Sequence, residues 1–257
     1  MAEMTKISTE RFMGDHALRV VLDAPKANIL DGEMMGQINA LLDELKDEAG
    51  LKLICFCGEG KHFSFGASVE EHVGERAAQM LDGFHGMFLR MAELGVFTAA
   101  AVSGRCLGGG MELAAFCNRV VAHPEAVFAQ PEIQLAVLPP IASLILPLKV
   151  GQSRADDINV TGRNVLASEA REMGLVDELA EEPVVAVEQW AERELAAKSA
   201  SSLRIAVKAS RWHFNHILCE QIKPMERFYL ETLMKTHDAN EGLAAFLDRR
   251  KPDFTHS

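Results

Sequence analysis

The sequence predicts an α/β fold, and three observations lead to that prediction. Short apolar or β-branched runs alternate with stretches whose apolar residues recur at helical spacing, a pattern typical of parallel strands joined by crossover helices. Two of the buried runs lead directly into glycine-bearing loops, at residues 58–60 and 103–110. Beyond Pro183 the pattern is helical. We therefore expect an α/β core over residues 1–199 and a helical C-terminal region over residues 200–257.

The first predicted elements are two strands with a helix between them. Residues 18–22 are a β-branched run that ends in Asp-Ala-Pro, which indicates a strand and its exit loop. Asp31 suits the N-cap of the next helix, because apolar residues then recur on one helical face up to Leu45. Residues 51–57 are a continuous apolar strand apart from Lys52, and Cys55 and Cys57 are expected on one side of it.

The pattern of strand, glycine loop and helix then returns. Residues 98–102 predict a strand, and the three glycines at 108–110 precede an apolar helix over residues 111–117. Residues 120–122 and 127–129 predict two more short strands. Helices follow over residues 184–197, over residues 202–218 and from residue 225 onward, the last broken near residues 237–240.

Composition excludes several classes of protein. The net charge is −11 and the basic residues are scattered, so nucleic acid is not an expected partner. No apolar run approaches the roughly 18 residues of a membrane span. The five cysteines form no CxxC pair and the N-terminus carries no export signal, so we expect a cytoplasmic protein. Nine histidines, three of them at 62, 72 and 85 near the first glycine loop, show no spacing for a metal site or a catalytic triad.

The glycine loops are the strongest local signal of chemistry. Three glycines before a helix let the backbone approach a ligand closely, and the helix N-terminus offers free N–H groups to an anion or oxyanion. The loop at residues 62–71 can present one more N–H, so two loops can converge on one carbonyl oxygen. A packing turn is the alternative for residues 108–110. Neither a dinucleotide fingerprint nor a P-loop is present.

Six segments in order resemble the landmarks of the crotonase superfamily, which includes the enoyl-CoA hydratases and isomerases. They lie at residues 25–28, 63–71, 106–113, 130–133, 170–177 and 241–246. The resemblance implies a crotonase-like spiral of ββα units and a helical C-terminal trimerisation region. It also implies a homo-oligomer, either a trimer or a hexamer built as a dimer of trimers. The implied partner is an acyl-CoA thioester substrate, with no separate cofactor and no metal.

The same resemblance assigns roles to individual residues. Ala67 and Gly109 would supply two oxyanion N–H groups, and Glu112 and Glu132 would form the acid/base pair of a hydratase. Adding water to an activated alkene needs one group to take a proton and one to give a proton, and two nearby carboxyls in a dry cleft cannot both ionise cheaply. Which glutamate is the acid stays open, and solvated surface carboxylates are the alternative. The CoA and substrate contacts implied are Lys26, Phe65, Ser68, Val69, Phe246 and Arg249, although Lys26 and Arg249 could equally be solvated surface charges.

Two departures from the common hydratases suggest a particular substrate. Residues 65–68 read Phe-Gly-Ala-Ser, and two prolines in residues 136–143 replace a glycine-rich stretch, so we expect an unusual, rigid turn at Glu132. These features resemble the subfamily that hydrates cyclohexa-1,5-diene-1-carbonyl-CoA to 6-hydroxycyclohex-1-ene-1-carbonyl-CoA in anaerobic aromatic (benzoyl-CoA) degradation. That reaction is a 1,4-addition of water, catalysed by a hydro-lyase. The alternatives are a general short-chain enoyl-CoA hydratase of fatty-acid β-oxidation and a non-catalytic acyl-CoA-binding homologue.

Overall fold

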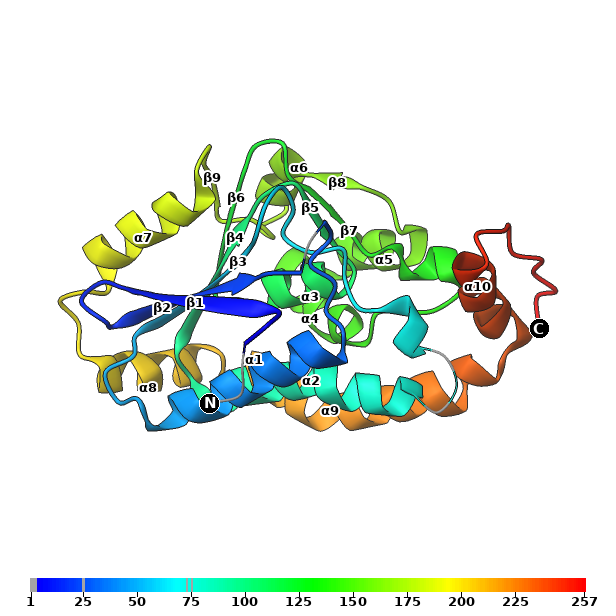
Figure 1. Ribbon diagram of the computed structural model, residues 1–257, viewed down its shortest axis with the longest axis horizontal. Coiled ribbons are helices and arrows are strands. Elements are labelled where there is room, and N and C mark those ends of the chain that lie inside the picture. Colours follow the sequence, from blue (N-terminus) through cyan, green and yellow to red (C-terminus); the bar gives the residue numbers. More distant parts are fainter. Residues whose placement is uncertain (1–3, 25, 73, 75) are drawn as a thin grey trace.

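The computed structural model describes residues 4–24, 26–72, 74 and 76–257, and it confirms an α/β fold (Figure 1). In this part of the chain the larger sheet has the strand order β1-β2-β3-β4-β6-β9, in which β1 and β2 are antiparallel and all other neighbours are parallel. Its strands are β1 (Ile7–Phe12), β2 (Ala17–Leu22), β3 (Leu53–Gly58), β4 (Phe97–Val102), β6 (Arg119–Ala122) and β9 (Glu178–Leu179). A smaller sheet joins β5 (Arg105–Leu107), β7 (Val127–Ala129) and β8 (Val165–Leu166).

The larger sheet is covered on both faces, which explains why its central strands are continuous apolar runs. Val20, Phe56 and Ala100 belong to the main core, which α1 (Gly32–Glu44), α2 (Arg76–Leu94) and α3 (Gly109–Phe116) complete. Cys55 and Cys57 share the opposite face, as predicted, and belong there to a second cluster that α7 (Pro183–Glu194) covers.

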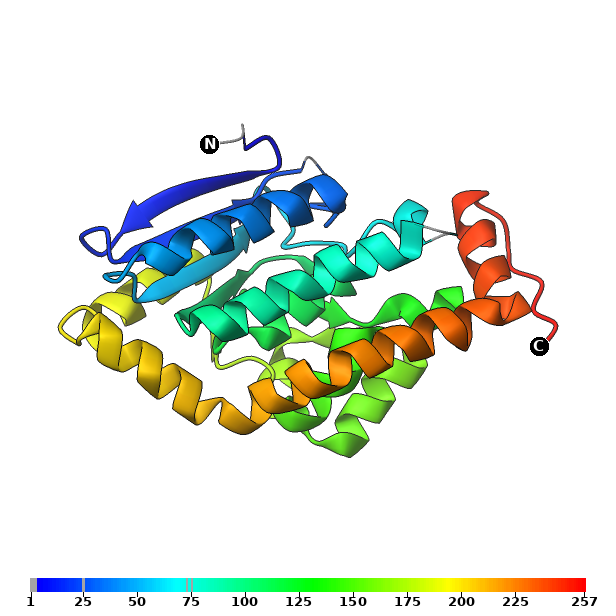
Figure 2. The ribbon, with the colours of Figure 1, turned by 90° about the horizontal axis from the view of Figure 1, so that it is seen from below.

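The remaining helices all lie in the second half of the chain. They are α4 (Pro140–Val150), α5 (Gln152–Thr161), α6 (Ala167–Glu172), α8 (Ala200–Ser210), α9 (Trp212–Glu231) and α10 (His237–Leu247). Single 3-10 turns are η1 (Leu45–Asp47), η2 (Val69–His72), η3 (Pro131–Leu135) and η4 (Leu233–Lys235). In Figure 2, α1, α2 and α9 run along one side of the molecule, and α9 packs against α2 and α4. The last helix, α10, packs against η2 and η3.

Most predicted elements are present, and the N-cap of α1 is confirmed. The side chain of Asp31 accepts a hydrogen bond from Met34 N at 2.9 Å. Residues 76–94, for which no element was predicted, form the long helix α2.

The predicted division of the C-terminal helices was wrong. The break lies at Arg211 rather than between residues 218 and 225, and Pro224 is inside α9. Arg211 is held at this break because its guanidinium donates to Phe116 O at 2.7 Å and stacks on the Phe116 and Phe214 rings. These tertiary contacts outweigh the local pattern.

The C-terminal region begins as a separate run of helices. Ser199 is the N-cap of α8, which starts at Ala200. The division at residues 199 and 200 stays a prediction, and so does the trimerisation role of residues 200–257. Within the described ranges, no helix combines the length and the apolar character needed to cross a membrane.

Candidate active site

The two glycine loops predicted from the sequence meet in the structure. A parallel bridge between Ser64 and Cys106 joins them, with Leu107 N donating to Ser64 O at 2.9 Å. Gly66 has a φ of 99°, a conformation that favours glycine. A Cβ atom on Gly66 would lie only 2.9 Å from Leu107 O and 3.0 Å from Gly109 N. The close approach of the loops therefore depends on the missing side chain.

Two backbone N–H groups lie beside each other where these loops touch. A Cβ atom on Gly109, the first residue of α3, would lie 3.2 Å from Ala67 N. Among the described residues, neither Ala67 N nor Gly109 N has a protein acceptor, whereas the preceding Gly66 N donates to Ser64 Oγ and Gly108 N donates to Ala129 O. The arrangement can accommodate one oxygen that carries partial negative charge.

Glu112 lies in the first turn of α3 and is only 3% exposed. Its Oε1 accepts a hydrogen bond from Ala142 N at 2.8 Å, in the first turn of α4. Pro140 begins that helix, and the carboxyl group of Glu112 is an acceptor for N–H groups that its first turn leaves free. Burial raises the pKa of Glu112 to about 7, although the N–H groups of Ala142 and Ile141 act in the opposite direction.

Glu132 approaches the same place from the short turn η3. A Cβ atom on Gly108 would lie 2.7 Å from Glu132 Oε1. The amide of Gln130 is fully buried and, with its nitrogen facing the carboxyl group, donates to Oε1 at 3.2 Å and to Oε2 at 3.0 Å. Burial and the nearby Glu112 raise the pKa of Glu132 well above its ordinary value. One of the two carboxyls therefore keeps a proton near neutral pH.

The segment with two prolines forms hydrogen bonds with both glutamates. The sequence predicted an effect of this segment on Glu132 alone. Ala136 ends η3 in the left-handed region with a φ of 55°, and Val137 N donates to Glu132 O at 3.1 Å. The prolines themselves begin α4, whose N-terminus faces Glu112. Residues 140–143, expected within a loop, are thus the first turn of a helix.

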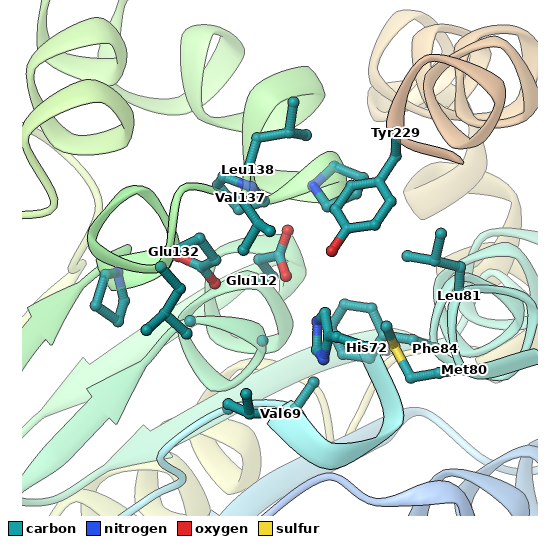
Figure 3. Close-up of a pocket in the computed structure, with 18 of the residues that line it drawn as sticks. Val69, His72, Met80, Leu81, Phe84, Glu112, Glu132, Val137, Leu138 and Tyr229 are labelled. Atoms are coloured by element: carbon teal, nitrogen blue, oxygen red, sulfur yellow. The ribbon is translucent and has the colours of Figure 1, made fainter. Parts of the chain in front are cut away.

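A cavity of about 630 Å³, counted with its open mouth, lies between these groups and the helices (Figure 3). Gly66, Ala67, Gly108, Gly109 and the two glutamates line one part of it. The other part is mainly apolar and is formed by side chains from α2, from the segment before α4 and from α10: Met80, Leu81, Phe84, Val137, Leu138 and Leu243.

The cavity contains some, but not all, of the residues predicted to bind substrate. Phe65, which is 38% exposed, and Val69 line it together with the predicted catalytic residues. Ser68 is adjacent but does not line it. Lys26, Phe246 and Arg249 are exposed and lie outside the lining, so their contacts with CoA stay predictions. Pro25, part of the first landmark, lies outside the described residues.

Two polar residues of the cavity were not predicted. Tyr229 reaches it from α9, and His72 reaches it from η2, where its Nδ1 is 2.7 Å from Ser68 O. Tyr229 is the only tyrosine in the sequence, which is the one signal that could have drawn attention to it. Among the described residues, no group of three or more His, Cys, Asp and Glu side chains is arranged to hold a metal ion.

Comparisons with known proteins agree with this geometry. The family model described as "Enoyl-CoA hydratase/isomerase" matches residues 15–257. The chain is 44% identical over 237 residues to cyclohexa-1,5-dienecarbonyl-CoA hydratase of Thauera aromatica, covering 92% of both chains. It is 34% identical over 241 residues to a protein of Mycobacterium tuberculosis named probable enoyl-CoA hydratase, covering 92% of this chain and 93% of that protein.

Solved structures share the fold. An enoyl-CoA hydratase from Bacillus halodurans superposes with a TM-score of 0.85 at 20% identity, covering 94% of this chain and 100% of that one. An enoyl-CoA hydratase from Mycobacterium avium subsp. paratuberculosis K-10 gives a TM-score of 0.83 at 22% identity, covering 98% of this chain and 100% of that one. At these identities the likeness concerns the fold alone.

Proposed function

Because this chain belongs to the enoyl-CoA hydratase/isomerase family and is a hydro-lyase acting on acyl-CoA thioesters, we propose that it hydrates cyclohexa-1,5-diene-1-carbonyl-CoA. The observation that carries the proposal is the pair of carboxyls, buried Glu112 and half-buried Glu132, beside two free backbone N–H groups in a mainly apolar cavity. The 44% identical relative from Thauera aromatica, which bears the name of that activity, supports the choice of substrate.

The N–H groups of Ala67 and Gly109 bind the thioester oxygen in this proposal. Polarising the thioester withdraws electrons from the conjugated double bonds and makes the carbon β to the carbonyl electrophilic. Negative charge develops on the thioester oxygen as water attacks, so donors already held in place stabilise the transition state more than the ground state. Removing one such donor costs about 3 to 4 kcal/mol in comparable sites.

Glu112 is the base and Glu132 is the acid in this mechanism. The N–H groups at the start of α4 favour the ionised form of Glu112, whereas Glu132, beside that negative charge, retains its proton. The water oxygen bonds to the β carbon while one of its protons passes to Glu112. Glu132 gives its proton to the far end of the diene, which leaves one ring double bond conjugated with the thioester. Return of a proton from Glu112 to Glu132 restores the starting state.

The test is turnover by the purified protein of cyclohexa-1,5-diene-1-carbonyl-CoA and crotonyl-CoA, with the products resolved by mass. We expect a strong preference for the cyclic diene, and a loss of about 10²- to 10⁴-fold in kcat for Glu112→Gln and for Glu132→Gln. Glu125→Gln, a change at an exposed glutamate between β6 and β7, is the matched control and should leave kcat unchanged.

Each other outcome contradicts a particular part of the proposal. Preference for crotonyl-CoA would indicate a general short-chain enoyl-CoA hydratase of fatty-acid β-oxidation instead. Hydration of neither thioester would favour a non-catalytic acyl-CoA-binding protein. Wild-type turnover by both glutamine variants would overturn the acid/base assignment whatever the substrate.

The assembly and the CoA contacts belong to the same proposal. We infer a homotrimer, or a hexamer of two trimers, located in the cytoplasm. Exposed apolar side chains on helices α8 and α9 of the C-terminal region support the association: Ile205, Trp212 and Phe228. Lys26, Ser68, Phe246 and Arg249 contact CoA in this proposal, and the exposed positions of Lys26 and Arg249 leave their charges available to phosphate groups.

A further inference from the structure

The hydroxyl group of Tyr229 is a polar group in the apolar part of the cavity. The residue is only 1% exposed, and its hydroxyl has no hydrogen-bond partner in the part of the chain that the structure describes. Figure 3 shows its ring projecting from α9 with the hydroxyl directed toward the carboxyl groups. Because leaving a buried hydroxyl without a partner is costly, the position indicates a partner that arrives with the ligand.

Contacts between α9 and α2 hold Tyr229 in place. One turn before it on α9, Glu226 Oε1 lies 2.7 Å from Nδ1 of His85, which is 1% exposed on α2. Lys223 donates to Asp82 on α2 and to Glu226, both at 3.1 Å. These contacts fix the register of α9 against the helix that carries Phe84 and Met80, so the hydroxyl occupies a defined place in the cavity.

The chemistry of the reactants limits what that partner can be. In the proposed reaction the acyl group beyond the carbonyl is a hydrocarbon, which offers no hydrogen-bond donor or acceptor. The thioester oxygen accepts hydrogen bonds from Ala67 N and Gly109 N in that reaction. Among the atoms that react, the remaining polar one is the oxygen of the water that adds, or of the hydroxyl group that it becomes.

We propose that the Tyr229 hydroxyl binds the attacking water, and the product's new hydroxyl group, as a second partner of that oxygen beside Glu112. The inference rests on the proposed hydratase function. One proton of the water passes to Glu112, and the second stays on oxygen and points to the phenol oxygen of Tyr229. A lone pair of the water oxygen is then left free to form the bond to the β carbon.

The ionisation state of Tyr229 agrees with this role. Burial and the nearby Glu132 and Glu112 raise the pKa of the phenol, so it stays neutral. A neutral phenol can orient the water by hydrogen bonding without competing for its proton. Tyr229 thus binds the reactant and leaves the proton transfers to the glutamates.

The test compares wild-type protein with Tyr229→Phe, which removes one oxygen and keeps the ring. We expect kcat for cyclohexa-1,5-diene-1-carbonyl-CoA to fall about tenfold, with KM changed by less than about twofold, because the lost hydrogen bond is to water rather than to the thioester. As inhibitors in initial-rate measurements, 6-hydroxycyclohex-1-ene-1-carbonyl-CoA should bind about tenfold more weakly to the variant, and cyclohexanecarbonyl-CoA should bind equally to both.

Controls separate this role from packing. Glu231→Gln changes an exposed residue of α9, two positions after Tyr229, and should alter none of these values. Tyr229→Phe should melt no lower than wild type, since it removes a buried hydroxyl that lacks a partner. Equal weakening of both inhibitors would show a packing role, and unchanged kcat and product affinity would show no role; either result overturns the inference. Wild-type protein that hydrates neither thioester would instead contradict the proposed function.

Discussion

The two ends of the cavity are built in different ways. The end proposed to bind the thioester, formed by residues 66–67 and 108–109, uses backbone N–H groups from two loops that touch each other. The end proposed to bind the acyl group uses side chains brought together from α2, the segment before α4, α9 and α10. A backbone site needs glycines at fixed places in the chain and therefore leaves a recognisable motif. A side-chain pocket needs only shape and apolar character, which many sequences can supply.

This difference predicts where one changed atom matters most. At the thioester end a single methyl group disturbs the donors, whereas at the acyl end it changes only the fit of the substrate. A change at the first end should affect every acyl-CoA alike, and a change at the second should discriminate between acyl groups.

The largest effect is expected at the thioester end, for Gly66→Ala. The new Cβ atom would lie 2.9 Å from Leu107 O and 3.0 Å from Gly109 N, at a φ of 99°, so the loops must separate. We expect kcat/KM to fall about 100-fold for the cyclic diene and for crotonyl-CoA alike, because both use the same N–H groups. Steady-state kinetics with both thioesters measure this.

Gly60→Ala is the matched control for that substitution. Gly60 has a φ of 75°, but a Cβ atom there would have nothing within 4 Å. It should lose about 1 kcal/mol of folding free energy through backbone strain and keep its kcat/KM. If Gly66→Ala were no more harmful to turnover than Gly60→Ala, contact between the loops would not matter for catalysis.

A smaller effect is expected at the acyl end, for Leu138→Ala. Leu138 lines the apolar part of the cavity, and shortening it removes contacts with the far side of a ring. We expect kcat/KM to fall about tenfold for the cyclic diene and about threefold for crotonyl-CoA, since a lost apolar contact in a pocket is worth about 1 to 3 kcal/mol.

The control at this end is Leu148→Ala on α4, where the side chain is 42% exposed and outside the cavity. Its kinetics should match those of wild type with both thioesters. If Leu138→Ala lowered kcat/KM equally for both thioesters, this part of the cavity would not discriminate between acyl groups as proposed.

The same contrast explains what the sequence could predict. The α/β fold and most of its strands followed from apolar periodicity, and the convergence of Ala67, Gly109, Glu112 and Glu132 followed from recognisable motifs in the two glycine loops and beside them. The place of Tyr229 in the cavity could not be predicted in this way. Helix α9 reaches the cavity only through packing against α2 and α4, and helical spacing does not show which helices will be its neighbours. The break at Arg211 escaped prediction for a similar reason, since the groups that hold Arg211 include Phe116, far away in the sequence.

The carboxyl pair lines the same part of the cavity as the backbone N–H groups, and the raised pKa of Glu112 should affect the stability of the protein. Burial raises the pKa of Glu112 from its ordinary value of 4.5 to about 7, so the folded state holds this proton more tightly than the unfolded state does. This stabilising contribution is fully present below pH 4.5 and is lost as the pH rises through about 7. The Glu112→Gln variant has no titrating carboxyl group at this position, so it should not lose folding stability in this way.

We therefore expect the stability difference between Glu112→Gln and wild type to shift in favour of the variant between pH 5 and pH 8, by about 2 to 3 kcal/mol. Urea unfolding at several pH values measures it, with Glu125→Gln as the control for the same substitution at an exposed position. A difference that stays constant with pH would mean that the carboxyl group of Glu112 titrates as it does in the unfolded chain. Burial in the cavity would then not raise the pKa of Glu112. The assignment of one glutamate as acid and the other as base would lose its physical basis.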